Sequence, residues 1–248
     1  MILFYFDHLH KNILQRKEAR QNNRPLVLVN AEYCQAALAL TPNPTPKFLE
    51  LAIQYFAESG KYAEALDALK HVPMPTPDDL LNMAQLHAIL KQYDEALKTY
   101  ALLENTKWDD NDKAANYYYN YAMTAVESGD QMLAIEKLKQ AFVLNPNSTT
   151  IQNALGYTMA DNNVELGRAK KLIEFALKKE PENLAIIDSM AWVYFRLGDY
   201  PNALNTLAPV IQRLPDDPKF DQNNADILDH LRQILDANGY HQLRNAFD

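Results

Sequence analysis

Glycine, cysteine and basic residues are all scarce in this sequence of 248 residues. Its six glycines lie too far apart for two of them to form a loop that cradles a phosphate group. Its single cysteine, Cys34, excludes an intramolecular disulfide bond. The 24 lysines and arginines are outnumbered by 32 acidic residues, which gives a net charge of −8. That charge argues against a nucleic-acid partner, because such partners require a basic surface.

Long hydrophobic runs are also absent, and no stretch approaches the roughly 20 apolar residues of a membrane-spanning helix. The apolar start, residues 1–6, ends at Asp7 and is too short for the core of a signal peptide. Glu32 and Tyr33 precede Cys34, where a lipoprotein signal has small residues. As it stands, the sequence predicts a cytoplasmic protein without signal peptide, lipobox or transmembrane segment. The alternative is a periplasmic or outer-membrane-associated protein, if the true start lies upstream.

What the chain does contain is a sequence period of about 34 residues, most regular between Ala115 and Asp217. Pro146, Pro181 and Pro215 close successive blocks and lie 35 and 34 residues apart. Small residues recur at three fixed places, which hold Ala122, Gly156 and Ala191, then Ala134, Ala169 and Ala203, then Ala141, Ala176 and Val210. This recurrence predicts pairs of closely crossing helices, and hence an all-α protein that binds partners.

The glycines provide an independent check on this period. If the blocks begin at Pro46, Pro77, Ala115, Thr149, Leu184 and Ala225, their fifteenth places are Gly60, Lys91, Gly129, Asn163, Gly198 and Gly239. Glycine, and after it asparagine, adopts most readily the left-handed conformation that a tight turn after a helix needs. We therefore expect the turn between the two helices of each block at this place.

The pattern resembles the tetratricopeptide repeat, a helix-turn-helix unit of 34 residues. Its signature is matched by Leu155, Gly156, Ala169, Ala176 and Pro181, and again by Tyr194, Gly198, Asp199, Tyr200, Ala203 and Pro215. The tryptophan usual near the start of the unit is replaced by Leu49, Leu80, Tyr118 and Ile187. The first two blocks also lack the clean terminal proline. The resemblance is strongest over residues 115–217 and implies a right-handed α-solenoid.

The predicted organisation is an N-terminal helical extension, five repeats and a C-terminal cap. The extension covers residues 1–45, with one helix over residues 7–20 and a second, interpreted as half of a degenerate repeat, over about residues 31–40. The repeats are placed at 46–76, 77–114, 115–148, 149–183 and 184–217, and the capping helices at 222–248.

A narrower likeness involves residues 153–160 and 187–194, which are similar to the C-terminal repeat arrays of bacterial envelope tetratricopeptide proteins. Many members of that group are longer, exported and tethered to the outer membrane. The likeness implies an envelope scaffold whose start lies upstream of this sequence.

In a solenoid of this kind, the first helix of each pair lines the concave wall. The second, fifth, sixth, ninth and twelfth places of each first helix are among those that face this wall. The predicted peptide-binding groove takes its residues from these places: Asn82, Gln85, Asn116, Tyr119, Asn120, Met123, Asn153, Tyr157, Asp188, Trp192 and Phe195. Asparagine amides can pair with any extended backbone, and aromatic rings provide rigid contact surface. In the alternative interpretation, Tyr157 and Trp192 pack between repeats.

Other residues give no sign of a reactive site. His8 and His10 are two apart and point to different sides of a helix, so a metal site is not expected. Neither Cys34 nor the serines have the surroundings of a nucleophile. The acidic run 109–112 lacks the spacing and glutamate of a calcium loop. We predict no catalytic residues, no metal and no cofactor, and hence no enzyme.

The predicted function is a protein–protein interaction scaffold or adaptor that holds a peptide or helix in the concave groove. One alternative is a membrane-peripheral envelope assembly factor, anchored by the basic N-terminal segment. Membrane contact is then expected only through residues 1–24, in which the basic stretch Lys11–Arg24 follows the apolar start. The other alternative is a homo-oligomer that associates through the ends of the array.

Overall fold

The computed structural model describes residues 26–41, 43–213 and 225–244, and all regular structure within these ranges is α-helical. The prediction of an all-α repeat protein is confirmed. The predicted helix over residues 7–20 and the proposed membrane contact of residues 1–24 lie outside the described residues. The chain divides into two compact units, Met1–Lys107 and Trp108–Asp248, which we call the N-terminal unit and the C-terminal unit.

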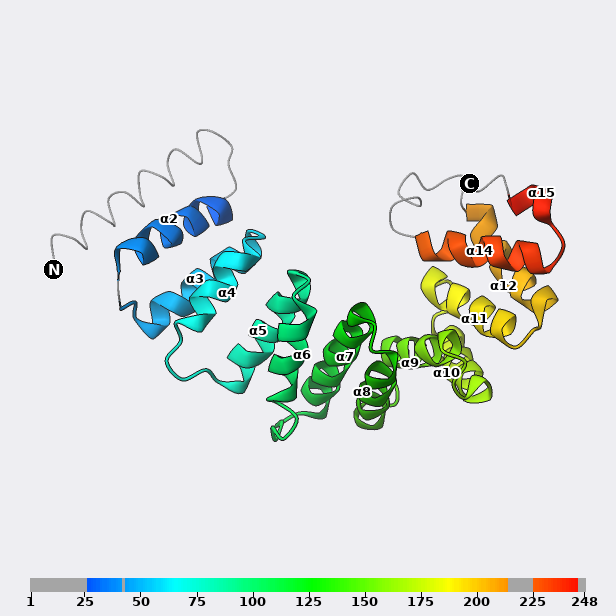
Figure 1. The fold of residues 1–248 in the computed structure, drawn as a ribbon, viewed down its shortest axis with the longest axis horizontal. Coiled ribbons are helices and arrows are strands. Elements are labelled where there is room, and N and C mark those ends of the chain that lie inside the picture. Colours follow the sequence, from blue (N-terminus) through cyan, green and yellow to red (C-terminus); the bar gives the residue numbers. More distant parts are fainter. Residues whose placement is uncertain (1–25, 42, 214–224, 245–248) are drawn as a thin grey trace. The chain divides into compact units, whose positions relative to one another are not determined.

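The N-terminal unit is a run of short helices in which successive helices pack side by side (Figure 1). They are α2 (Leu26–Leu40), α3 (Pro46–Glu58), α4 (Tyr62–Lys70), α5 (Pro77–Ile89) and α6 (Tyr93–Ala101). Helix α2 is longer than expected, because it begins at Leu26 rather than near Ala31. Leu49, Phe56 and Leu69 form the centre of a core against which Cys34 of α2 also packs.

Local sequence explains where the first helices of this unit begin. Pro46 and Pro77 occupy the first helical turn of α3 and α5, where a missing N–H costs nothing. Thr45 and Thr76 precede them and accept hydrogen bonds from backbone N–H groups of the first turn. Thr76 also forms a capping box with Asp79, whose carboxylate accepts from the Thr76 backbone N–H at 2.8 Å.

Within the described residues, the C-terminal unit contains eight helices. They are α7 (Asn111–Ser128), α8 (Gln131–Leu144), α9 (Thr149–Asp161), α10 (Leu166–Lys179), α11 (Leu184–Arg196), α12 (Tyr200–Arg213), α14 (Ala225–Ala237) and α15 (His241–Arg244). Helix α7 begins at Asn111, inside the acidic run 109–112, because Asp110 caps it by accepting from the Asp112 N–H. Ser148 and Asn183 cap α9 and α11 in the same way.

The turns lie where the period places them. Positive φ angles occur at Gly60, Lys91, Gly129, Asn163, Gly198 and Gly239, all six of the predicted fifteenth places. Lys91 holds this conformation at φ 57° with a side chain, a backbone geometry that disfavours any residue with a Cβ atom. The prediction of a left-handed turn after each first helix is confirmed.

The small residues sit where helices cross. The alanines of the three recurring places are fully buried or nearly so. At Gly156 of α9, an added Cβ atom would lie 2.6 Å from Ile173 Cγ1 and 2.9 Å from the Ala169 carbonyl oxygen of α10. Only glycine therefore permits this helix pair to approach so closely, as the period predicts.

The division into five repeats and a cap stays a prediction, since the helix bounds do not by themselves define repeat boundaries. In the described parts of the chain, none of the helices combines the length and apolar character needed to span a membrane.

Candidate functional site

Each unit has a pocket lined mainly by the first helices of its pairs. The pocket of the C-terminal unit, which we call the C-terminal pocket, has a volume of about 430 Å³. Its lining comes from α7, α9, α11 and α14 and from the connector before α11: Tyr119, Met123, Thr149, Thr150, Asn153, Ala154, Tyr157, Glu180, Asn183, Ala185, Ile186, Asp188, Ser189, Asp226 and Ile227. The second helices of the pairs contribute no residue to this lining.

One of the pockets of the N-terminal unit, which we call the N-terminal pocket, has a volume of about 740 Å³. Helices α3 and α5 supply most of its lining, and Tyr62 of α4 and the segment between α4 and α5 supply the rest. Its acidic residues are Glu50 and Asp79, and Asp79 is already engaged by Thr76. Exposed apolar side chains, including Met74 and Ile89, contribute to its wall.

The predicted groove residues fall into three groups in the structure. Tyr119, Met123, Asn153, Tyr157 and Asp188 come together in the C-terminal pocket. Asn82 and Gln85 line the N-terminal pocket. Asn116, Asn120, Trp192 and Phe195 line neither pocket. Their role in binding, like that of the other residues, stays a prediction.

Trp192 lies in the interior of the C-terminal unit, with only 4% of its surface exposed. Its ring stacks on His230 of α14 at 4.0 Å between centroids and on Phe195 at 4.9 Å. Its indole N–H donates to Asp161 Oδ1 at 3.2 Å. Trp192 thus joins α9, α11 and α14, and of the two interpretations made from sequence, its burial favours packing between repeats.

The stacked His230 also belongs to a buried cluster of polar side chains. His230 Nδ1 is 2.8 Å from Asp188 Oδ2, and both side chains are 7% exposed. The opposite nitrogen of the same ring, Nε2, is 3.4 Å from the Tyr157 hydroxyl oxygen. Three first helices of the C-terminal unit, α9, α11 and α14, are linked through this imidazole.

Two acceptor atoms at the C-terminal pocket have no hydrogen-bond donor. They are Asp188 Oδ1 and Asn153 Oδ1, both buried, on side chains that line the pocket. A buried acceptor without a donor costs free energy, because it has lost its hydrogen bonds to water. The pocket is therefore equipped to receive hydrogen-bond donors.

The electrostatic environment of the pocket is acidic. Burial raises the pKa of the Tyr157 phenol, the nearby charges of Asp161, Asp188 and Asp226 raise it further, and the charge of Arg196 lowers it. At the rim, hydrogen bonds from Thr149 and Asn183 lower the pKa of the Glu180 carboxyl, which favours its charged form.

Sequence reasoning missed His230, Asp226 and Glu180. His230 and Asp226 occupy the sixth and second places of the block that begins at Ala225, so the period itself could have identified them. Glu180 lies in a connector, outside the positions that the period assigns to the wall, and no sequence signal marked it.

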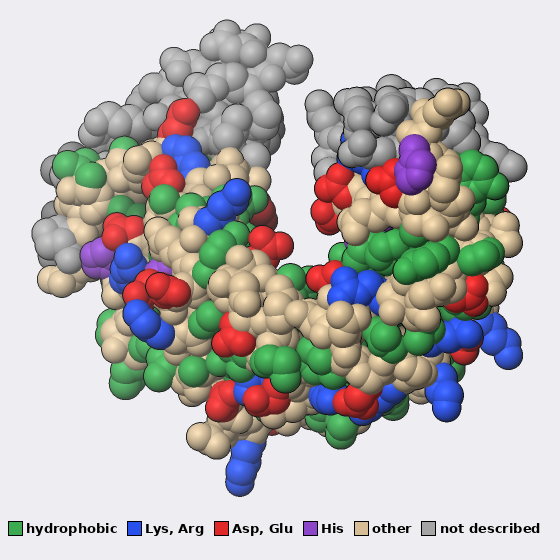
Figure 2. Space-filling model, turned by 45° about the vertical axis from the view of Figure 1, so that its right-hand side comes forward, with side chains coloured by type: hydrophobic (Ala, Val, Ile, Leu, Met, Phe, Trp, Pro, Cys, Tyr) green, Lys and Arg blue, Asp and Glu red, His purple; other side chains and the backbone are tan. Residues whose placement is uncertain are grey.

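Charged side chains of both signs are mixed on the visible face of the molecule, together with hydrophobic ones (Figure 2). On that face they do not gather into a basic patch of the kind that nucleic acid contacts.

The sequence of this chain is similar to those of known repeat proteins. The family model described as "Tetratricopeptide repeat" matches residues 65–242. The TPR repeat-containing protein PA4667 of Pseudomonas aeruginosa is 31% identical over 161 residues, which cover 64% of this chain and 27% of that protein. Bacteriophage adsorption protein A of Escherichia coli is 32% identical over 88 residues, or 36% of this chain and 9% of that protein. This chain therefore spans about a quarter or less of the length of these two curated relatives.

Among solved structures, a tetratricopeptide repeat protein from Parabacteroides merdae matches with a TM-score of 0.67. The two chains are 16% identical, and the match covers 96% of this chain and 89% of the other. At this identity the similarity concerns the fold. Repeats of this family are typically non-catalytic and serve as scaffolds for protein–protein interaction. With the family model matching well over half of the sequence, the chain belongs to the tetratricopeptide repeat family.

Proposed function

We propose that this protein is a non-catalytic scaffold that binds an extended segment or a helix of a partner protein along the wall formed by its first helices. The observation that carries the proposal is the origin of the two pocket linings. In both units the lining comes mainly from first helices and combines amide, hydroxyl and apolar side chains. Such a wall offers hydrogen bonds to a backbone and apolar contact to side chains.

A solved structure supports the proposal by analogy. YrrB, described as "a TPR protein with an unusual peptide-binding site", matches with a TM-score of 0.54 at 14% identity. The match covers 87% of this chain and 97% of YrrB. The likeness concerns the fold, and we transfer from it only the idea that such a wall can hold a peptide.

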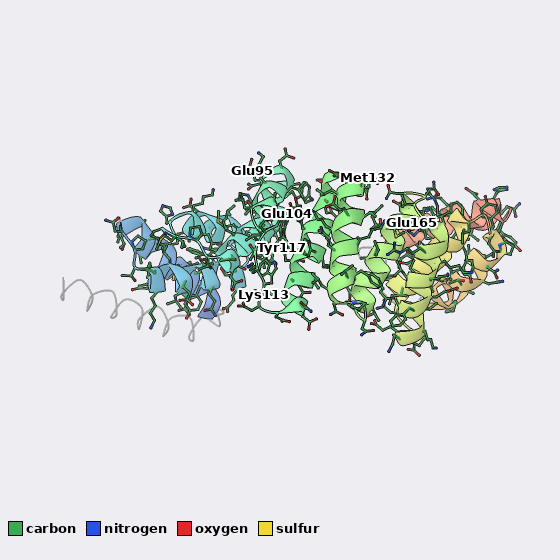
Figure 3. The ribbon with its side chains drawn as sticks, turned by 90° about the horizontal axis from the view of Figure 1, so that it is seen from below. Glu95, Glu104, Lys113, Tyr117, Met132 and Glu165 are labelled. Atoms are coloured by element: carbon green, nitrogen blue, oxygen red, sulfur yellow. The ribbon has the colours of Figure 1, made fainter. Side chains whose placement is uncertain are left out.

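Site-specific photocrosslinking in the source cell tests the proposal. A photoreactive phenylalanine analogue replaces Tyr119 on the first-helix wall or, as a matched control, Met132 on α8. Met132 is 66% exposed and is labelled in Figure 3. We expect a covalent product with a partner protein from the Tyr119 position and none from the Met132 position.

Two results would oppose the proposal. A partner captured from Met132 and not from Tyr119 would place binding on the second helices. A product that contains only a second copy of this chain would favour the homo-oligomer. The alternative of an envelope location is tested separately, by fractionating cells that express the gene with its natural upstream sequence.

A further inference from the structure

The C-terminal pocket differs from an ordinary polar groove in having buried acceptors that lack donors. Asp188 is 5% exposed, and its Oδ2 contacts His230 while its Oδ1 has no partner. Asn153 Oδ1 on the neighbouring helix α9 is likewise buried and unpaired. Both residues line the pocket, so a donor that enters it can pair with either acceptor.

The depth of these acceptors restricts what can reach them. Each oxygen is almost inaccessible to solvent, so a donor reaches it only when the side chains around it turn aside. A backbone N–H of a segment lying across the first helices has no stem on which to enter. A donor at the end of a long, thin stem meets the requirement. Lysine and arginine carry their cations on such stems, and both bury the stem against apolar surface.

The rest of the lining suits a cation. Asp188, Asp226 and Glu180 supply carboxylates, and none of the residues that the structure places in the lining is lysine, arginine or histidine. Tyr119, Met123 and Tyr157 provide apolar and aromatic surface beside them. Aromatic faces attract cations, and carboxylates form their strongest hydrogen bonds with charged donors.

We propose that the C-terminal pocket is a specificity site that takes a lysine or arginine side chain of the bound protein segment. This inference rests on the proposed function and names the chemistry of its partner. The cation approaches the free Oδ1 of Asp188, the aliphatic stem lies against Tyr119 and Tyr157, and Asp226 and Glu180 add long-range attraction from the rim.

The test uses three acetylated, amidated pentapeptides that differ only in the central residue, which is lysine, arginine or norleucine. Norleucine keeps the apolar stem of lysine and removes the charge. Each peptide is titrated into the full chain labelled with ¹⁵N, and the side-chain amide of Asn153 is followed by NMR. We expect the lysine and arginine peptides to shift this signal and to bind roughly tenfold more tightly than the norleucine peptide. Added salt should reduce the difference.

Matched variants locate the effect. Asp188→Asn keeps the shape of the side chain and should abolish most of the preference for lysine. Asp226→Asn and Glu180→Gln leave the buried Asp188–His230 contact intact and should each reduce the preference. Glu174 is an exposed residue of α10 that does not line the pocket, so Glu174→Gln should leave the preference unchanged.

Equal binding of the lysine and norleucine peptides would overturn this inference while leaving the proposed function intact. Loss of the preference in Glu174→Gln to the same degree as in Asp226→Asn would also overturn it, because the effect would then come from overall charge. Absence of binding by all three peptides would overturn it too. The proposed function itself is decided by the crosslinking experiment, which does not depend on these peptides.

Discussion

The N-terminal and C-terminal units use the same helix pair but end its second helix at different points. Helices α4 and α6 have 9 residues each, whereas α8, α10 and α12 have 14 each. In the C-terminal unit, α8 and α10 end shortly before Pro146 and Pro181. In the N-terminal unit, α4 ends at Lys70, shortly before Pro73. Because a proline disfavours helix in the residue before it, the position of this proline limits how far α4, α8 and α10 extend. Helix α6 ends at Ala101 without a nearby proline.

The two pockets differ in chemistry as well. The carboxylate of Asp79 in the N-terminal pocket is used to cap α5, whereas Asp188 in the C-terminal pocket keeps one oxygen without a donor. An acidic residue on a first helix can thus serve the fold in one unit and remain available to a ligand in the other. The two pockets therefore offer different chemistry to a ligand, although equivalent helices line them.

The largest effect should come from Trp192→Ala, which tests whether the C-terminal unit depends on its aromatic stack. Truncation of a buried tryptophan should lower the free energy of unfolding by about 3–5 kcal/mol, measured by urea titration with circular dichroism. Tyr157→Phe keeps the ring of a residue that lines the C-terminal pocket, and should change the free energy of unfolding by about 1 kcal/mol or less. A loss below about 1 kcal/mol for Trp192→Ala would mean that the stack is not part of the core of this unit.

The next effect concerns the close helix crossing of the C-terminal unit. In Gly156→Val the new Cβ atom meets the Ala169 carbonyl oxygen, which cannot move without shifting α10. We expect a loss of about 2–3 kcal/mol in thermal or urea unfolding. Gly167→Ala is the control, because nothing lies within 4 Å of that position and it should stabilise α10 slightly. Equal responses of the two variants would contradict the close crossing.

A reciprocal pair of substitutions compares the turns of the two units. Gly198→Val forces a β-branched residue into the left-handed region at φ 78° and should destabilise by about 1–2 kcal/mol. Lys91→Gly removes the corresponding strain at φ 57° in the N-terminal unit and should stabilise by about 1 kcal/mol. Melting temperatures that move in the same direction for both variants would contradict the shared role of these places.

The smallest effect concerns Cys34, which is buried in the N-terminal unit. Burial raises the pKa of its thiol to about 11, whereas an exposed thiol has a pKa of about 8.5. Between these pH values the unfolded chain loses the thiol proton and the folded chain keeps it, so stability falls as the pH rises. Alkylation by iodoacetamide should be slow in the folded protein at pH 8 and fast in urea. Fast alkylation without urea would contradict this burial.

Much of the fold could be predicted from the sequence, because the signals are local and repeated. A left-handed turn needs glycine or asparagine, and a close crossing needs a small side chain, so both leave marks at fixed spacing. The same spacing extended to the cap would have found His230 and Asp226. The sequence left the burial of Trp192 as one of two interpretations, because a ninth place that faces the wall in one repeat is covered when the cap packs on it. The free oxygen of Asp188 depends on one contact from a distant helix, which no periodicity specifies.

Hydrogen–deuterium exchange of the complex with the partner captured by crosslinking tests the central claim most directly. The claim is that the first helices of the C-terminal unit form the binding wall. Binding should slow exchange in α7, α9 and α11 and leave α8, α10 and α12 unchanged; all of these helices are marked in Figure 1. Protection confined to the second helices, with none in the first, would contradict the account.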